Sequence, residues 1–307
     1  MSGPSDGGGL EATMDGYEDT VELARLAELI QQVTGFRDGP SLRGKLRTIV
    51  GASEDERASG WLQRLGRGWI SSSEWQALLD RLLVPETFFF RDLPQLDVLR
   101  QHVLPGIIAA KRSGTRSIRV WSAGCSTGEE PYTLAMLVLD ALVAAGEATE
   151  MLGGAIHPAS GWSVSVSGTD ISARVVDKAR AGIYSDFGLS PFRDTPQEYR
   201  RFFVPKDGDG AISRFTVRND VRSVTSFSVH NIKDGALGTD FDIVSCRNVM
   251  IYFDDAHKRV ALGNLAQALA PDGFMLLGPT DPFDVLPGFQ LVDPRISPIL
   301  AKRPAKR

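Results

Sequence analysis

Strand-like and helix-like segments alternate through the second half of this 307-residue chain, and this alternation constrains its fold more than any other feature. Short apolar runs typical of buried strands lie at residues 118–124, 162–170, 241–248 and 274–280. Longer segments of helical character lie between them, at residues 129–146, 172–182 and 256–273. This order predicts an α/β fold, with a parallel sheet covered by helices on both faces.

One stretch interrupts the alternation. Between residues 185 and 228, short strand-like segments are joined by turns of the Asp-Gly type. We therefore expect a small antiparallel β insertion at about 185–228, whose last strand rejoins the main sheet.

The chain before the alternation has helical periodicity from residue 21 to about 83. Apolar side chains recur at the spacing of one helix face, at Leu23, Leu26, Ala27 and Ile30. Ser71 and Glu74 form a capping-box pattern ahead of a further apolar run. The predicted organisation is a disordered tail over 1–18, an all-helical domain and linker over 19–92, and the α/β domain over 93–307.

Composition narrows the functional classes. The net charge is −4 and charged residues make up 23% of the chain, so no overall basic field points to a nucleic acid partner. No apolar run is long enough to span a bilayer, and the N-terminal residues lack the pattern of a secretory signal. The two cysteines, Cys125 and Cys246, cannot form a disulfide framework. We expect a cytoplasmic protein with no membrane insertion, no nucleic acid partner and no metal site.

The strongest functional signal is WSAGCSTGEEPY, residues 121–132, which follows the first strand. Small residues from Gly124 to Gly128 let a ligand approach the backbone at the carboxyl end of a strand, where open α/β sheets bind ligands. A phosphate loop would continue with Gly-Lys-Ser/Thr, whereas this loop continues with Glu129 and Glu130. The two carboxylates favour a cationic, adenosine-bearing ligand. The alternative is that they only stabilise the helix dipole.

Asp170 ends the next strand, in GTDIS, where a carboxylate is placed to bind ribose hydroxyls. The alternative is a cap for the following helix, a role for which Ser172 is better suited. In nicotinamide-binding units the acid lies about 20 residues beyond the glycine loop. Here it lies much farther on, and no Gly-x-Gly-x-x-Gly is present, which argues against a dehydrogenase.

Polar residues also follow two later strands. Arg247 and Asn248 stand in FDIVSCRNVMIYFD and have either a structural role or a ligand contact, because a buried arginine needs partners. Asn231 is a weak candidate for a contact to an adenine edge, since Asn is common in turns.

The junction between the two predicted domains reads VPETFFFRD, residues 84–92. Its three phenylalanines and Arg91 form either an interdomain core with an ion pair or a wall that closes over the ligand. In the second case Arg91 meets a carboxylate and Thr87 donates a hydrogen bond.

A basic stretch lies within the helical part, between residues 33 and 70. Arg43 and Arg47 share one helix face at a spacing of four residues. This face is either solvated surface or a docking face for an acidic partner.

Several segments together resemble the chemotaxis receptor glutamate methyltransferases, a bacterial family. They run in order over roughly residues 78–300 and read VPETFFFR, RVWSAGCSTGEEPYTLAM, GTDIS, ARAGIY, FDIVSCRNVMIYF and LAPDGFMLLG. The resemblance implies a Rossmann-like class I methyltransferase domain that depends on S-adenosylmethionine, with a small β insertion and a preceding all-helical domain. It implies methyl transfer to glutamate carboxylates on chemoreceptor cytoplasmic helices, with S-adenosylhomocysteine as the second product. The receptor would then be the acidic partner of the Arg43/Arg47 face.

The resemblance also implies the site residues. The cofactor would be bound by Thr87, Arg91, Gly124, Glu129, Asp170, Asn231, Ile232, Cys246 and Arg247. Tyr252 would lie close to the transferred methyl group, and Arg91 would orient the substrate carboxylate. Because glutamate has a reference pKa of about 4.3, it is already ionised near neutral pH and no general base is needed.

Two departures from the family pattern leave other functions open. Pro85 stands where the family usually has Asn, and GPTDPFD, residues 278–284, stands where it commonly has Gly-His-Ser-Glu. One alternative is a degenerate signalling module that binds S-adenosylmethionine or S-adenosylhomocysteine without turnover. Another is a methyltransferase that acts on a protein other than a receptor.

Overall fold

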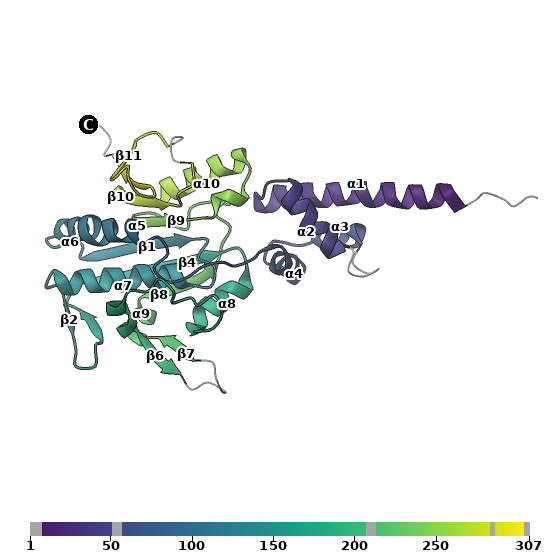
Figure 1. The fold of residues 1–307 in the computed structure, drawn as a ribbon. Coiled ribbons are helices and arrows are strands. Elements are labelled where there is room, and N and C mark those ends of the chain that lie inside the picture. The colour runs from purple at the N-terminus through teal and green to yellow at the C-terminus, as the bar shows by residue number, and fades with distance from the viewer. Residues whose placement is uncertain (1–7, 51–56, 207–212, 283–285, 304–307) are drawn as a thin grey trace, which may run out of the picture. The chain divides into compact units, whose positions relative to one another are not determined.

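The computed structural model describes residues 8–50, 57–206, 213–282 and 286–303, with side chains from residue 21 onward (Figure 1). It divides into two compact units. The first comprises Met1–Val84 together with Tyr252–His257, and the second comprises Pro85–Ile251 and Lys258–Arg307. Each unit is described separately below.

The first unit is helical. Its elements are α1 (Gly8–Thr34), α2 (Pro40–Val50), α3 (Ala58–Leu65) and α4 (Ser73–Leu82). A core of aliphatic and tryptophan side chains holds them together, including Leu26, Ile30, Leu46, Leu65, Trp61, Trp75 and Leu78. Residues 8–18 of the predicted tail lie within α1, and residues 1–7 lie outside the described part of the chain.

Helix α4 begins one residue later than the capping pattern indicates. Ser72, and not Ser71, occupies the N-cap position, and its side chain accepts a 3.4 Å hydrogen bond from the backbone N–H of Trp75. Three consecutive serines offer the same capping chemistry. Trp75 is buried, and its indole N–H donates to the carbonyl of Leu65 at 3.2 Å. This position of Trp75 determines which serine starts the helix.

A short segment from late in the chain belongs to the first unit. The backbone N–H of Arg37 donates to the carbonyl of Tyr252 at 2.7 Å, and Phe36 forms an antiparallel bridge with Phe253. The side-chain amide of Gln31 donates to Asp254 at 2.7 Å. Residues at and just after the end of α1 therefore contact residues 252–254, which lie more than 200 positions later in the sequence.

The second unit is built on a seven-stranded sheet of order β11-β12-β10-β9-β1-β4-β8. The strands are β1 (Ser117–Ala123), β4 (Ser163–Asp170), β8 (Thr225–Val229), β9 (Phe241–Cys246), β10 (Leu269–Leu277), β11 (Phe289–Leu291) and β12 (Ile299–Lys302). The five strands from β10 to β8 pair in parallel. Strand β12 runs antiparallel to both β10 and β11. The predicted α/β fold class is confirmed.

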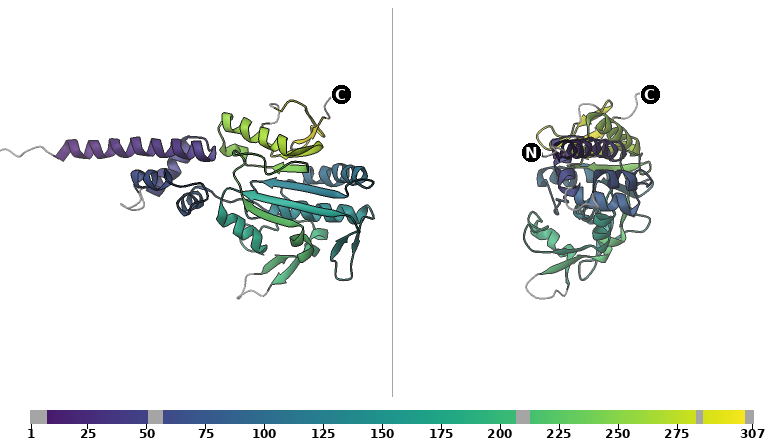
Figure 2. Two further views of the ribbon diagram at one scale, coloured as in Figure 1. Left: turned by 180° about the vertical axis from the view of Figure 1, so that it is seen from behind. Right: turned by 90° about the vertical axis from the view of Figure 1, so that its right-hand side faces the viewer.

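Helices cover both faces of this sheet (Figures 1 and 2). From β1 the chain passes through α7 (Glu129–Ala144) to β4, and through α8 (Ala173–Ala181) to β8. From β9 it passes through α10 (Asp255–Ala268) to β10, in the opposite direction across the sheet. Because parallel crossovers are right-handed, α10 lies on the face opposite α7 and α8. The point of reversal lies between β1 and β9.

Further helical turns precede and follow the central strands. The helix expected between Pro94 and about Ala110 consists of α5 (Leu93–Val98), a π-helical turn η2 (Leu99–Val103) and α6 (Leu104–Lys111). The remaining short elements are α9 (Asn219–Ser223), η3 (Gln197–Phe202) and η4 (Met250–Tyr252). In the described parts of the chain, no helix combines the length and apolar character needed to cross a membrane.

The predicted antiparallel insertion is present as a three-stranded sheet of order β5-β7-β6. Its strands are β5 (Ile183–Ser185), β6 (Phe203–Lys206) and β7 (Arg214–Val217). The last strand of the region, β8, rejoins the main sheet beside β4, as expected.

A second small sheet was not predicted from the sequence. It is a hairpin of β2 (Ala148–Glu150) and β3 (Ile156–Pro158). Met151 and Leu152 lie between its strands and are exposed.

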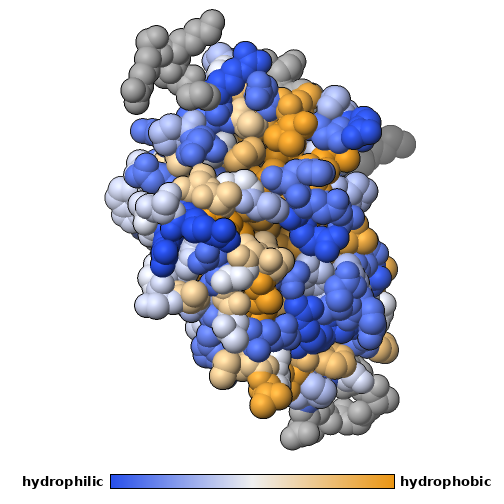
Figure 3. Space-filling view, turned by 90° about the vertical axis from the view of Figure 1, so that its left-hand side faces the viewer, coloured by the Kyte–Doolittle hydropathy of each residue, from blue (hydrophilic) through white to orange (hydrophobic). Residues whose placement is uncertain are grey.

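In the space-filling view of Figure 3, hydrophobic residues lie in small groups separated by hydrophilic ones.

Candidate functional site

The loop after β1 runs through backbone conformations that leave its surface bare. Gly124 and Gly128 have φ values of +77° and +97°, and Ser126 also has a positive φ of 49°. A Cβ atom at Gly124 would lie 2.3 Å from Cγ2 of Val249, and one at Gly128 would lie 2.7 Å from Cβ of Ala179. Both positions therefore require glycine, because neither the conformation nor the space admits a side chain.

Asp170, at the carboxyl end of β4, is tied to this loop. Its carboxylate accepts hydrogen bonds from the backbone N–H groups of Ser126 at 2.9 Å and Ser172 at 3.0 Å. Burial raises the pKa of Asp170 above its usual value, and these backbone bonds oppose the shift. The carboxylate thus connects the β1 loop to the start of α8, at the place predicted for a ribose contact.

Glu129 is the first residue of α7 and is only 4% exposed. The hydroxyl of Thr127 donates to its carboxylate at 2.7 Å. Burial raises the pKa of Glu129 to about 7, against smaller lowering effects from Thr127, the backbone, Lys178 and Arg193. A buried carboxylate with this pKa gains a strong partner when a cation binds beside it.

The neighbouring Glu130 has a different environment. Its carboxylate accepts a 2.7 Å hydrogen bond from Ser122 and lies 3.3 Å from the guanidinium of Arg247. Arg247 also donates to the backbone carbonyl of Arg91 and lies 3.9 Å from the carboxylate of Asp92. Of the two roles expected for Arg247, these contacts favour the structural one, which joins the ends of β1 and β9 to residues 91–92.

Three further predicted residues, Asn231, Ile232 and Cys246, lie near strand ends, as does Cys125, which was not among the predicted site residues. Asn231 and Ile232 are buried after β8, and the side-chain oxygen of Asn231 accepts from the backbone N–H of Lys233 at 3.2 Å. Cys246, the last residue of β9, and Cys125 in the β1 loop are also buried. Burial, with Asp170 near Cys125 and Asp281 near Cys246, raises the pKa of each thiol well above its usual value, so both remain protonated.

Thr87 and Arg91 lie in the segment that opens the second unit. Phe89 and Phe90 in this segment are fully buried, whereas Thr87, Phe88 and Arg91 are partly exposed. Arg91 donates to the carbonyl of Glu86 at 3.0 Å. Phe89 stacks on Phe192 of the insertion at 5.4 Å between ring centroids. The phenylalanine run therefore anchors this segment within the second unit.

Backbone strain is concentrated around these loops. Among the described residues, six non-glycine positions have a positive φ, and four of them are Phe90, Asp92, Ser126 and Asn248. Non-glycine residues in this conformation persist where the surrounding structure holds them, and they gather at functional sites.

Tyr252, the second predicted catalytic residue, groups with the first unit and is 44% exposed. Its ring lies 6.2 Å from that of Phe36. Its predicted position beside the transferred methyl group stays a prediction.

The β1 loop also offers a polar atom without a partner. The hydroxyl oxygen of Ser126 is buried and has no hydrogen-bond partner in the described part of the chain. Buried polar atoms are nearly always satisfied, so this hydroxyl fits a site completed by a ligand. Together with Glu129 and the bare backbone at Gly124, it suits a ligand that carries hydroxyl, amine and positively charged groups.

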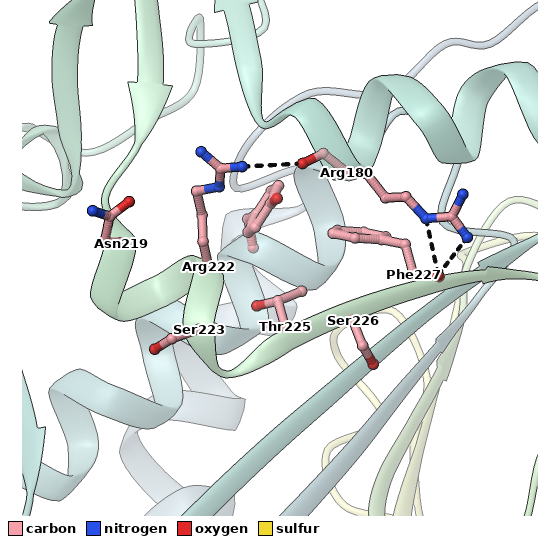
Figure 4. Close-up of a pocket in the computed structure, with 8 residues that line it drawn as sticks. Arg180, Asn219, Arg222, Ser223, Thr225, Ser226 and Phe227 are labelled. Atoms are coloured by element: carbon pink, nitrogen blue, oxygen red, sulfur yellow. Dashed lines mark hydrogen bonds between the residues drawn. The ribbon is translucent and has the colours of Figure 1, made fainter.

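A different cavity, of about 460 Å³, lies beside β8 (Figure 4). Its lining consists of Tyr132, Arg180, Asn219, Arg222, Ser223, Thr225, Ser226 and Phe227. The guanidinium of Arg180 donates to the carbonyl of Phe227 at 2.9 Å, and that of Arg222 donates to the carbonyl of Arg180 at 3.3 Å. None of the predicted site residues lines this cavity, so it is separate from the candidate cofactor site.

The reversal point of a parallel sheet, an acid-rimmed glycine loop and a buried carboxylate at the next strand define a domain that binds a nucleoside ligand without phosphates. Comparison with known proteins identifies the family of this domain. Residues 85–291 match the family model described as "CheR methyltransferase, SAM binding domain". The chain therefore belongs to the CheR methyltransferase family, and its cofactor is S-adenosylmethionine.

Named relatives agree with this assignment. The chain is 37% identical over 206 residues to a "Chemotaxis protein methyltransferase" of Vibrio parahaemolyticus, covering 67% of each protein. It is 36% identical over 220 residues to the protein of that name from Escherichia coli, covering 70% of this chain and 67% of the relative. The predicted family and cofactor are confirmed, and the chain is a methyltransferase.

A third relative extends over the first unit as well. It is an "Uncharacterized 104.1 kDa protein" of Rhodobacter capsulatus, 28% identical over 306 residues, covering 94% of this chain and 29% of the relative. Among solved structures, the glycopeptide N-methyltransferase MtfA complexed with S-adenosylmethionine is 16% identical, with a TM-score of 0.30, covering 62% of this chain and 56% of that chain.

One buried residue near these loops was not predicted from the sequence. Asp281 stands in the departing GPTDPFD segment and is 3% exposed. Its carboxylate accepts from the backbone N–H groups of Gly278 at 2.7 Å and Asn248 at 3.2 Å, which connects the loops after β9 and β10. Thr127 lies in the small-residue loop that the sequence predicted, but its hydrogen bond to Glu129 was not predicted.

Proposed function

We propose that this protein transfers a methyl group from S-adenosylmethionine to glutamate side chains on the cytoplasmic helices of chemoreceptors, forming glutamate methyl esters. This makes it a protein-glutamate O-methyltransferase of chemotaxis-type adaptation, working in the cytoplasm. The observation that carries the proposal is the family match over residues 85–291 together with the buried carboxylate of Glu129 in the glycine loop.

The electrostatics of the loop support this chemistry. S-adenosylmethionine supplies a methyl group on a positively charged sulfur. Glu129 and Asp170 offer carboxylates on the ligand side of the loop, and a dry site strengthens their attraction for a cation. Gly124 and Gly128 let the ligand lie directly against the backbone.

The transfer itself requires alignment and no base. A carboxylate oxygen of the substrate forms a bond to the methyl carbon as the carbon–sulfur bond breaks, and the electron pair of that bond stays on sulfur. The substrate is already ionised, so no proton has to be removed. Holding the reacting atoms in line supplies up to about 7–11 kcal/mol. We assign this orientation to Arg91, and from the family pattern we expect Tyr252 close to the transferred methyl group.

We infer the remaining cofactor contacts from the same family pattern. Thr87, Asn231 and Ile232 would line the adenosine and methionine parts, with Cys246 and Arg247 behind them. Protonated thiols and a paired arginine suit supporting positions. Pro85 has no N–H or side-chain amide to offer, so any contact that an Asn supplies at this position has to come from another residue.

The Arg43/Arg47 face is our candidate receptor-docking surface. Arg43 pairs with Asp38 through two 2.7 Å hydrogen bonds, which leaves Arg47 as the less neutralised of the two. A receptor helix with exposed glutamates is an acidic partner of matching charge.

The test is methyl transfer from radiolabelled S-adenosylmethionine to receptor cytoplasmic fragments. We expect label on the receptor that is released by mild base, as methyl esters are. Receptor fragments with the accepting glutamates changed to alanine are the matched control. Cofactor binding without turnover would instead support the degenerate signalling module, and label on other proteins would support a non-receptor substrate.

A further inference from the structure

Two arginines flank one aromatic ring at the start of the second unit. The guanidinium carbon of Arg193 lies 3.6 Å from the ring centroid of Phe88, and that of Arg91 lies 5.6 Å from the same centroid. Both distances are within the range of a cation–π contact. Phe88 itself is partly exposed, unlike Phe89 and Phe90.

The backbone around Arg193 is firmly held. Phe192 is fully buried and stacks on Phe89, with ring planes inclined by only 13°. The backbone N–H of Phe89 donates to the carbonyl of Pro191 at 2.8 Å. Arg193 Nη1 donates to the carbonyl of Ser190 at 3.1 Å. Because the backbone on either side of this exposed arginine is held in place, its guanidinium is preorganised for binding a ligand.

The charge of Arg193 reaches the cofactor loop. It is one of two cations, with Lys178, that lower the pKa of Glu129 against the effect of burial. Direct contacts give the same connection: the ring of Tyr184 lies 6.5 Å from that of Phe192, and the hydroxyl of Tyr184 donates to the carbonyl of Thr127 at 2.8 Å, two residues before Glu129. No carboxylate of the described residues forms an ion pair with Arg193, so its guanidinium has donors to offer.

We propose that Arg193 binds the carboxylate of the incoming substrate glutamate. The ring of Phe88, which contacts the guanidinium groups of both Arg193 and Arg91, holds Arg193 in position. This inference rests on the proposed function, because it names a residue for the carboxylate that the reaction requires. Glu129, which would attract the cofactor, and Arg193, which would attract the substrate, would then lie at the same site.

The exposure of Arg193 suits this role. A fully buried arginine would form a strong ion pair that holds the carboxylate electrons away from the methyl group. An exposed guanidinium stays partly solvated, so it orients the carboxylate with a weaker attraction. Its planar fork fixes the direction of both oxygens, which a lysine cannot do.

The experiment compares Arg193→Ala, Arg193→Lys and Phe88→Leu with the unaltered full-length protein in the receptor-fragment methylation assay. For Arg193→Ala we expect the KM for the receptor to rise about tenfold, as expected when one charge-assisted hydrogen bond is lost. The Kd for S-adenosylmethionine, measured by calorimetry at pH 8, where Glu129 is mostly ionised, should change far less than the KM for the receptor. Arg193→Lys should retain only part of the wild-type affinity, and Phe88→Leu should raise KM because it removes the ring that holds Arg193 in position.

Arg119→Ala is the matched control. Arg119 also stacks on an aromatic ring, with its guanidinium 4.7 Å from Phe241, but it lies in the first half of β1, away from the carboxyl end. Its KM for the receptor should equal that of the unaltered protein. This control separates the loss of a stacked arginine in general from the loss of Arg193.

The outcomes distinguish the two proposals. If the unaltered protein methylates receptors and Arg193→Ala has the same KM, the inference is wrong and the proposed function stands. If Arg193→Ala weakens S-adenosylmethionine binding and leaves the receptor KM unchanged, Arg193 belongs to the cofactor site and the inference is overturned. If the unaltered protein never labels receptors, the proposed function fails and this inference with it.

Discussion

The loops after β1 and β9 leave neighbouring parallel strands at the same edge of the sheet, yet they treat their charged residues in opposite ways. After β1, the carboxylate of Glu129 is buried with a neutral hydroxyl partner, and the hydroxyl of Ser126 has no partner among the described residues. After β9, Arg247 meets two carboxylates and a backbone carbonyl.

The difference separates groups that await a ligand from groups that support the site. A buried acid without a cationic partner is costly unless a cation arrives, so under the proposed function the charge of Glu129 is what the cationic cofactor would recognise. The guanidinium of Arg247 is mostly committed to two carboxylates and the carbonyl of Arg91, with only Nε left without a partner among the described residues, and its removal would leave the acids around it uncompensated. The predictions below test this contrast, from the largest expected effect to the smallest.

Arg247→Met should lower the free energy of unfolding of the second unit by about 3–5 kcal/mol, the usual cost of removing one partner of a buried ion pair. The physical reason is that Glu130 and Asp92 lose their common cation. Urea denaturation followed by circular dichroism measures the effect. Arg295→Met removes an ion pair on an 85% exposed side chain and should leave the urea midpoint unchanged. A midpoint for Arg247→Met equal to that control would break the contrast.

Glu129→Gln should weaken S-adenosylmethionine binding by roughly 10- to 100-fold, because a charge-assisted contact is lost. It should not destabilise the fold. Burial raises the pKa of Glu129 from 4.5 to about 7, so its ionisation opposes folding increasingly as the pH rises through this window. The glutamine variant should therefore be at least as stable at pH 8. Calorimetric titration and thermal unfolding of the same sample test both statements, and Glu22→Gln in α1 is the control.

The affinity for S-adenosylmethionine should fall about tenfold between pH 8 and pH 6. Glu129 with a pKa of about 7 is mostly ionised at the first pH and mostly protonated at the second, and only the ionised form attracts the cationic ligand. Binding at pH 6 should release up to about one proton per cofactor, measured by calorimetry in buffers of different ionisation enthalpy. A release that persists in Glu129→Gln would assign the proton to another group.

Thr127→Val should shift the midpoint of this pH dependence upward by about one pH unit, the smallest effect of the four. The hydroxyl of Thr127 stabilises the ionised form of Glu129 through its 2.7 Å hydrogen bond. Losing a hydrogen bond to a charged group, at about 1.5 kcal/mol, corresponds to about one pKa unit. The same titrations measure it, and an unchanged midpoint would mean that this hydroxyl does not bind Glu129 in solution.

Much of the α/β fold could be predicted from local sequence. The strands β1, β4, β9 and β10 are short apolar runs, and α7 and α8 begin where the sequence changes period. The end of α10 could not be predicted in the same way. The Pro-Asp-Gly at residues 271–273 looks like a helix stop, but α10 already ends at Ala268 and these residues lie in a shifted part of β10. Pairing with β9 outweighs the local turn preference.

The site shows the same division. Gly124, Glu129 and Asp170 could be proposed as site residues from the sequence because small and acidic residues directly after apolar strands are typical of ligand-binding loops in open α/β sheets. Arg193 and Asp281 carried no local signal, since an arginine or aspartate in a polar segment is usually solvated surface. The role proposed for Arg193 and the contacts of Asp281 depend on Phe88 and Asn248, which are distant in the sequence and near in space.

The sequence by itself determined the parallel sheet, the glycine loop and its preference for a cation, because these follow from periodicity and from the residue types next to each strand end. Only the tertiary structure decided which of the two adjacent glutamates has a cation as its partner. Glu129 and Glu130 are the same residue type, one position apart on α7, so they point in different directions from the helix. One meets Thr127 in a buried space and the other meets Arg247, and that distinction comes from the packing of β9 beside β1.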